Sequence, residues 1–138
     1  MQSNIAIIIC TWNRATLLDQ TLTGLSILAS AQPADTPHVI LVDNNSKDST
    51  REVAEKHAAL WPAGRFHYIF EARQGKQFAL NSGIKAATDL GCAICAFTDD
   101  DIDVPADWVT RIRAALDDPG IELVGGKTLL QWPPGGPP

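Results

Sequence analysis

Five carboxylates crowd into nine residues of this chain, directly after an apolar segment typical of a buried strand. They are Asp99, Asp100, Asp101, Asp103 and Asp107. Like charges this close repel one another unless a cation compensates them. A hard divalent ion is the natural compensator, because Mg2+ and Mn2+ prefer carboxylate oxygen and often share their coordination sphere with phosphates. The cluster therefore indicates a Mg2+ or Mn2+ site, with a solvated acidic turn that caps the next helix as the alternative.

Polar residues that could bind an anion or a base also follow the other apolar runs. They are Thr11, Asn13 and Arg14 after the first run, Asp43 after the second, and Arg73 and Lys76 after the third. The cations could neutralise a diphosphate. A carboxylate at Asp43 could accept a ring N–H of uracil, thymine or guanine, and an Asx turn is its structural alternative.

The elements that position these residues follow from an alternation of apolar runs and helix-period segments. The runs predict strands at 5–10, 38–42, 66–70, 92–97 and 121–124, and the periodicity predicts helices at 15–30, 49–60, 78–87 and from Pro105 to Leu116. Ser49 and Glu52 have the spacing of a capping box. This order predicts an α/β fold, a doubly wound, mostly parallel Rossmann-like sheet with helices on both faces. Ligands then bind beyond the carboxyl ends of the strands, where the polar residues lie.

Residues 1–130 are expected to form one domain, and residues 131–138 a tail rich in proline and glycine. No segment after 121–124 has the pattern of a further helix. The domain is therefore expected to be truncated, with a missing C-terminal half and an uncovered edge near 121–130 that invites self-association.

Composition narrows the class of protein further. A net charge of -5 and a pI near 5.0 argue against binding to nucleic acid or to an anionic membrane surface. The three cysteines, at positions 10, 92 and 95, lie in apolar runs and are expected to pack in the core as reduced thiols. The protein is therefore expected to be cytoplasmic. An association with a membrane is expected only through its pathway or a missing segment. The histidines at positions 38, 57 and 67 are scattered and show no ligand pair.

Three familiar phosphate- and metal-binding motifs are excluded. The turn after the first strand, 11–14, contains no glycine, which removes both the dinucleotide fingerprint and the P-loop. An EF-hand that begins at Asp99 fails, because Val104 and Thr110 stand where the loop needs glycine and glutamate.

Four segments in order resemble the nucleotide-sugar-binding part of the family 2 glycosyltransferases, which have the GT-A fold. Residues 7–14 resemble the opening strand and its P-T-Y-N-R turn, with departures at Cys10 and Trp12. Residues 39–50 are similar to the VVDNGSTDGT segment, 75–84 to G-x-x-x-A-x-N-x-G-I, and 97–101 to the metal-binding D-x-D strand exit.

The resemblance implies metal-assisted transfer of a sugar from a nucleotide diphosphate donor, UDP favoured, to a saccharide, lipid or protein acceptor, with inversion. Thr11, Asn13 and Arg14 would line the nucleotide pocket, Asp43 would hold the base, and Arg73 or Lys76 would lie near base or phosphates. Asp101 would bind the metal and Asp99 the ribose or the metal's water shell, with Asp100 as the alternative ligand. The general base is expected beyond residue 138. The alternative function is a nucleotide-sugar or nucleotide-diphosphate binding module without transferase activity.

Overall fold

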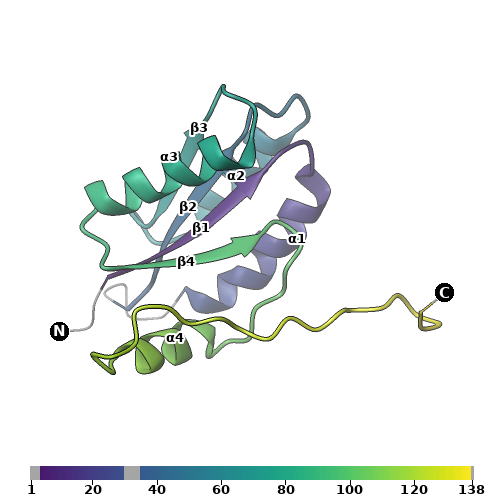
Figure 1. Cartoon of the computed structure of the whole chain (residues 1–138). Helices are drawn as coiled ribbons and strands as arrows, with labels where there is room; N and C mark the ends of the chain where they lie inside the picture. The colour runs from purple at the N-terminus through teal and green to yellow at the C-terminus, as the bar shows by residue number, and fades with distance from the viewer. Residues whose placement is uncertain (1–3, 30–34, 138) are drawn as a thin grey trace.

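The computed structural model describes residues 4–29 and 35–137, and these form an α/β sandwich around one parallel sheet. The strands are β1 (Ile5–Thr11), β2 (His38–Asp43), β3 (Phe66–Phe70) and β4 (Ile94–Asp99), in the spatial order β3-β2-β1-β4 (Figure 1). The helices are α1 (Ala15–Leu25), the short 3-10 turn η1 (Ser26–Leu28), α2 (Thr50–Leu60), α3 (Lys76–Asp89) and α4 (Trp108–Leu116). The predicted doubly wound, parallel class is confirmed.

The central strand β1 is apolar along almost its whole length because both of its faces are covered. Ile5, Ile7 and Ile9 pack into a core shared with α1, α2 and α4. Ala6 and Ile8 point the other way and pack against α3. Figure 1 shows α3 on one face of the sheet and α1 and α2 on the other. Side chains that leave the strand ends are therefore held on a rigid, doubly covered support.

Helix α3 lies unusually close to the sheet at Gly83. A Cβ atom placed on this glycine would lie 2.6 Å from Cγ2 of Ile8 and 3.3 Å from Cγ2 of Val42. Only a residue without a side chain allows this approach. The close contact fixes the height of α3 over β1 and β2, and with it the place of Lys76 in the first turn of the helix.

The fifth strand expected at 121–124 is wrong. Residues 121–132 have neither helix nor strand, and Leu123 is 89% exposed. An apolar run becomes a strand only where a neighbour supplies a ladder of hydrogen bonds. The chain after α4 instead extends away from the sheet (Figure 1).

Helix boundaries differ from the predictions by a few residues, and the capping box at the start of α2 is wrong. The Ser49 side chain makes no cap hydrogen bond. Asp48 takes this role: its Oδ1 accepts from the Thr50 amide at 3.1 Å and from the Thr50 hydroxyl at 2.6 Å. Helix α1 ends at Leu25 and continues as η1, and the predicted end at residue 30 lies outside the described residues.

The prediction that the histidines are scattered is wrong for two of them. The parallel pairing of β2 and β3 places Nδ1 of His38 3.0 Å from Nε2 of His67. Nη1 of Arg65 donates to Nε2 of His38 at 2.8 Å. Because a guanidinium can only donate, His38 must carry its proton on Nδ1 and donate it to His67. Burial lowers the pKa of both rings, His38 and His67, so the pair is neutral.

The three cysteines are free thiols, as expected, and all are partly buried. Burial raises the pKa of Cys10 to about 11 and also raises the pKa of Cys92 and of Cys95. Such thiols are weak nucleophiles. Within 4–29 and 35–137, no helix is both long and apolar enough to cross a membrane.

Candidate functional site

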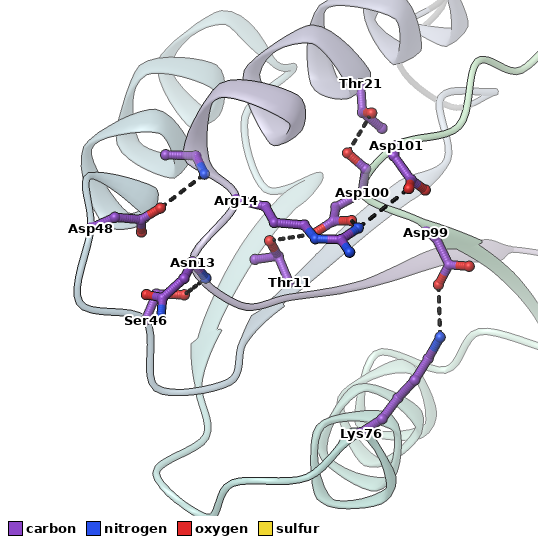
Figure 2. Close-up of polar contacts among 11 residues, drawn as sticks. Thr11, Asn13, Arg14, Thr21, Ser46, Asp48, Lys76, Asp99, Asp100 and Asp101 are labelled. Atoms are coloured by element: carbon purple, nitrogen blue, oxygen red, sulfur yellow. Dashed lines mark hydrogen bonds and ion pairs between the residues drawn. The ribbon is translucent and has the colours of Figure 1, made fainter. Parts of the chain in front are cut away.

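The ends of β1 and β4 and the first turn of α3 enclose a pocket of about 510 Å³ at the carboxyl edge of the sheet. Eight of the twelve residues that line it are polar or charged. Figure 2 draws Thr11, Arg14, Lys76 and the three aspartates among them. The lining residues are Cys10, Thr11, Trp12, Arg14, Asn44, Gln74, Gly75, Lys76, Ala79, Asp99, Asp100 and Asp101. The structure thus brings together Thr11, Arg14, Lys76 and the three successive aspartates. Asn13, Asp43 and Arg73 are not among the lining residues.

The middle aspartate, Asp100, is the buried one of the three. Its Oδ2 accepts a 2.7 Å hydrogen bond from the Thr11 hydroxyl, and its backbone oxygen accepts one of 2.7 Å from the Thr21 hydroxyl. Nη1 of Arg14 lies 3.3 Å from its other carboxylate oxygen, Oδ1. Asp100 therefore ties the end of β4 to β1 and α1.

The flanking carboxylates point into the open pocket and are each paired with a cation. Lys76 Nζ lies 2.8 Å from Asp99 Oδ1, and Arg14 Nη1 lies 3.3 Å from Asp101 Oδ2 (Figure 2). The hydrogen bond to Asp99 raises the pKa of Lys76. The side chains of Asp99 and Asp101 remain 55% and 45% exposed, so both are accessible to a ligand.

The donor set fits a divalent ion that arrives with phosphate oxygens, but not a metal held by protein alone. In the described part of the chain, no group of three or more His, Cys, Asp or Glu side chains could hold a metal ion. Two accessible carboxylates, Asp99 and Asp101, share the pocket. Mg2+ and Mn2+ are commonly bound by one or two carboxylates together with substrate phosphates and water. The oxygens of Asp100 are already engaged by Thr11 and Arg14.

Asn13 and Asp48 join the exits of β1 and β2. The Asn13 amide N–H donates to the Ser46 hydroxyl at 2.9 Å, and Asn13 Oδ1 accepts from the Lys47 amide at 2.7 Å. Asp48 Oδ2 accepts from the Ala15 amide at the start of α1 at 3.0 Å. Desolvation would raise the pKa of Asp48, but hydrogen bonds from Thr50 and Ala15 hold it below its usual value. Asn13 thus positions the loop that carries Arg14.

Asn44 joins the exits of β2 and β3. Its Nδ2 donates to the backbone oxygens of Glu71 at 3.2 Å and of Arg73 at 2.7 Å. Its Oδ1 accepts from the Gly75 amide at 2.9 Å. One buried amide side chain therefore sets the path of the loop that leads into Lys76.

Asp43 is 3% exposed and both of its carboxylate oxygens have partners. Oδ1 accepts from the Ser46 amide at 2.8 Å, and Oδ2 accepts from the Tyr68 hydroxyl at 2.8 Å. The contact to Ser46 is the turn that the sequence offered as the structural alternative. Each oxygen retains a further lone pair, so the role in base binding stays a prediction.

Arg73 is held by a neighbouring carboxylate outside the pocket lining. Nε and Nη2 of Arg73 each donate to Glu71 at 2.9 Å, and the guanidinium lies 4.8 Å from the centre of the Phe78 ring. The Ser82 hydroxyl donates to the same carboxylate at 2.6 Å. The Arg73 side chain, followed by Ser82, holds the pKa of Glu71 well below its usual range. This bidentate pair fixes the chain after β3, next to Gln74 of the pocket lining, but does not itself line the pocket.

Several residues of the site were missed by the sequence analysis. Asn44 and Glu71 follow strands directly, so their position was a usable signal, but an amide and a lone carboxylate indicate no particular chemistry. Trp12 lines the pocket and is 53% exposed, a position that its apolar type does not suggest. Gln74 and Gly75 also line the pocket, through a loop whose path only the contacts of Asn44 define.

Comparison with known proteins identifies one family. Residues 6–130 match glycosyl transferase family 2. The chain is 29% identical over 132 residues to glycosyltransferase AglE of Haloferax volcanii, which covers 96% of this chain and 41% of that protein. It is 35% identical over 98 residues to an uncharacterized glycosyltransferase of Mycobacterium bovis, which covers 68% of this chain and 40% of the relative. It thus spans about two fifths of the length of these curated relatives.

Solved structures share the fold. The mannosyltransferase PcManGT from Pyrobaculum calidifontis, in complex with GDP-Man and Mn2+, has a TM-score of 0.70 and 27% identity, over 91% of this chain and 34% of that one. TarS 1-349 from S. aureus, in complex with UDP-GlcNAc, has a TM-score of 0.69 over 93% of this chain and 37% of that one, and its 19% identity speaks for the fold alone. The sheet order, the polar strand exits and the family match agree with the GT-A fold that the sequence resembles. The chain belongs to glycosyl transferase family 2.

Proposed function

We propose that the pocket at the carboxyl edge binds the nucleoside diphosphate of a sugar donor together with Mg2+ or Mn2+. The observation that carries this proposal is the placement of two accessible carboxylates, Asp99 and Asp101, beside two accessible cations, Arg14 and Lys76, in one pocket. Its volume of about 510 Å³ is in the range of small-molecule sites. The similar mannosyltransferase from Pyrobaculum calidifontis was solved with a nucleotide sugar and Mn2+.

Each residue has a defined role in this proposal. Asp99 and Asp101 hold the metal, and Arg14 and Lys76 contact the phosphate oxygens. Trp12 offers an exposed indole face on which a planar base can stack. Thr11 and Asn13 position the strand exit through Asp100 and Ser46. The bound metal supplies Lewis-acid stabilisation of the charge that develops on the departing diphosphate.

The base is expected to be one with a ring N–H that a carboxylate at Asp43 can accept. Uracil and thymine offer N3–H, and guanine offers N1–H with its amino group, whereas cytosine offers no ring N–H. UDP is the first candidate, with GDP and dTDP as alternatives. CDP then serves as the matched negative control.

We further propose that residues 1–130 form a donor-binding domain and residues 131–138 a tail. For the whole protein we propose transfer of the sugar, with inversion, to a saccharide, lipid or protein acceptor. Free, protonated thiols fit a reducing cytoplasm. The competing function is a nucleotide-sugar binding module without transfer. Release of free nucleoside diphosphate that depends on an added acceptor distinguishes the two, because a binding module returns the donor intact.

Thermal unfolding tests the binding step. A ligand that binds only the folded state raises the free energy of unfolding by about 2.7 kcal/mol when its concentration is a hundred times its Kd. Mn2+ with UDP, GDP or dTDP should raise the Tm by more than the two separate shifts combined. Asp101→Asn should abolish this excess.

Asp107→Asn is the matched control, because Asp107 belongs to the same acidic run but pairs with Arg111 on α4 at 2.6 Å, outside the pocket lining. It should retain the full metal-dependent shift. A wild-type chain whose Tm does not respond to metal with any of the three nucleotides would show that the acidic run is a solvated turn.

A further inference from the structure

Two different kinds of ion pair occur at the carboxyl edge of the sheet, one outside the pocket lining and one within it. Arg73 is locked by two parallel hydrogen bonds to Glu71, which is buried and also bound by Ser82. Arg14 and Lys76 make single contacts to the flanking aspartates, whose own side chains are 45% and 55% exposed. The Arg73 side chain is as exposed as that of Lys76, at 65%, so its pair differs in the two parallel hydrogen bonds and in the burial of Glu71. Exposed single-contact pairs, such as those of Arg14 and Lys76, contribute little to stability. The cations at Arg14 and Lys76 can therefore leave their carboxylates at small cost, whereas Arg73 cannot.

The charge at the pocket shows why such cations are needed. The formal charge of the five side chains is -1, because three are carboxylates and two are cations. They are Asp99, Asp100 and Asp101 with Arg14 and Lys76. A divalent ion would change this charge to +1. The pocket would then attract a diphosphate, and the two cations would no longer be needed at the carboxylates.

We propose that Arg14 and Lys76 are exchangeable counter-ions. They neutralise Asp101 and Asp99 in the free protein, and they pass to the diphosphate oxygens when a divalent metal takes over these carboxylates. The inference rests on the proposed function and adds a coupling between metal and nucleotide to it. The metal alone must displace both cations from the flanking carboxylates, which leaves Arg14 with only its contact to Asp100 and takes Lys76 from its partner Asp99. The diphosphate supplies a new partner for both cations, so each ligand strengthens the binding of the other by the same factor.

The contacts of Arg14 suit such an exchange. Its Nη1 bridges two carboxylates, at 3.3 Å from Asp100 Oδ1 and 3.3 Å from Asp101 Oδ2. Asp100 stays bound to Thr11 and keeps one end of the bridge in place. Arg14 can thus release Asp101 and still remain at the pocket, within the same lining as Lys76.

The inference predicts effects of opposite sign for one substitution. Arg14→Met should bind Mn2+ alone about three- to tenfold more tightly, because a competing positive charge beside the carboxylates is gone. The same variant should bind UDP more weakly at saturating Mn2+, because a phosphate ligand is lost. Lys76→Met should likewise bind Mn2+ more tightly and UDP more weakly, because Lys76 is the cation that pairs with Asp99. A residue that only contacts phosphate would leave the affinity for Mn2+ unchanged.

The experiment measures free Mn2+ by electron paramagnetic resonance and UDP binding by calorimetry, on the whole chain at constant ionic strength. Arg111→Met is the control for loss of one positive charge, since Arg111 on α4 pairs with Asp107, and both affinities should stay at the wild-type values. Arg73→Met should leave the affinity for Mn2+ unchanged, because Arg73 is bound to Glu71 and not to a metal carboxylate.

Each outcome bears on a different statement. Tighter Mn2+ binding with weaker UDP binding in Arg14→Met supports the exchange. Unchanged or weaker Mn2+ binding in Arg14→Met and Lys76→Met, in a wild-type chain that binds both ligands, overturns the exchange and leaves the proposed function standing. An equal gain in Mn2+ affinity in Arg111→Met also overturns the exchange, because the gain would then come from the change in the net charge of the protein. A wild-type chain that binds neither ligand overturns both.

Discussion

The hydroxyl of Thr11 donates a 2.7 Å hydrogen bond to Oδ2 of Asp100, and this buried contact joins the ends of β1 and β4. Asp100 is 5% exposed, and the residues on both sides of it point into the open pocket. Three chemically identical residues in a row thus divide into one structural anchor and two accessible ligand candidates. This division can be tested by comparing the stability and the ligand binding of single variants.

Asp100→Ala should destabilise the fold, whereas Asp101→Ala should not. The first change leaves the Thr11 hydroxyl buried without its acceptor, which costs about 1–3 kcal/mol. The second removes an exposed carboxylate and should alter the free energy of unfolding by no more than about 0.5 kcal/mol. Urea unfolding without added ligand measures both. Equal losses in the two variants would contradict the assignment of Asp100 as the anchor.

Asp43→Ala should weaken UDP binding about ten- to a hundredfold, the loss expected for a charged hydrogen bond of about 1.5–3 kcal/mol. Calorimetry at saturating Mn2+ measures the affinity. Tyr68→Phe is the matched control, because it removes only the internal donor to Asp43 Oδ2 and keeps the carboxylate. It should bind UDP about as tightly as the wild type. Wild-type affinity in Asp43→Ala would place the base elsewhere in the pocket.

The protein should lose stability as the pH falls below about 6.5, the usual pKa of an unfolded histidine. Burial lowers the pKa of His38 and of His67 in the folded state, so the unfolded chain binds protons first as the pH falls. The pair contributes fully to the free energy of unfolding above pH 6.5. This contribution is lost as the pH falls from 6.5 through the lowered pKa values that the two histidines have in the folded protein.

Urea unfolding between pH 8 and pH 5 measures this loss. The double variant His38→Asn/His67→Asn should show a flatter profile over the same range. The pKa values of Asp19 and Glu71 are lowered by their cationic partners, so their own contributions are lost only at more acidic pH. An identical slope in the wild type and the double variant would assign the pH dependence to other groups.

Gly83→Ala should destabilise the protein, although alanine usually stabilises a helix by about 0.5–1 kcal/mol relative to glycine. The added Cβ would lie 2.6 Å from Cγ2 of Ile8, and overpacking of this kind costs about 1–3 kcal/mol. Gly125→Ala is the control, because its Cβ would meet nothing within 4 Å. The free energy of unfolding should fall only in the first variant. A more stable Gly83→Ala protein would show that α3 moves outward without cost.

The class of fold and the edge that carries the site could be predicted from the sequence. A central parallel strand buried on both faces has to be apolar at nearly every position, as residues 5–10 are. Polar residues that interrupt such a pattern right after a strand have to lie at its carboxyl end. Thr11, Arg14, Lys76 and the three aspartates were therefore assigned to one edge before any contact between them was known.

The sequence could not predict which aspartate is buried, which cation pairs with which aspartate, or that His38 meets His67. These properties depend on residues far apart in the chain. The register that pairs Cys10 with Asp99 brings the next residues, Thr11 and Asp100, together, and the pairing of β2 with β3 does the same for the histidines.

The missing strand at 121–124 and the contact of Asp48 with the start of α1 both depend on partners far apart in the chain. An apolar run needs a neighbouring strand, and the first turn of α1 finds its acceptor, Asp48, in a loop 33 positions away. The sequence by itself determined the four strands of the doubly covered sheet and the edge that is polar, because burial acts on each segment separately. Only the tertiary structure decided the partner of each charged side chain, because hydrogen bonds and ion pairs require two groups at a defined distance.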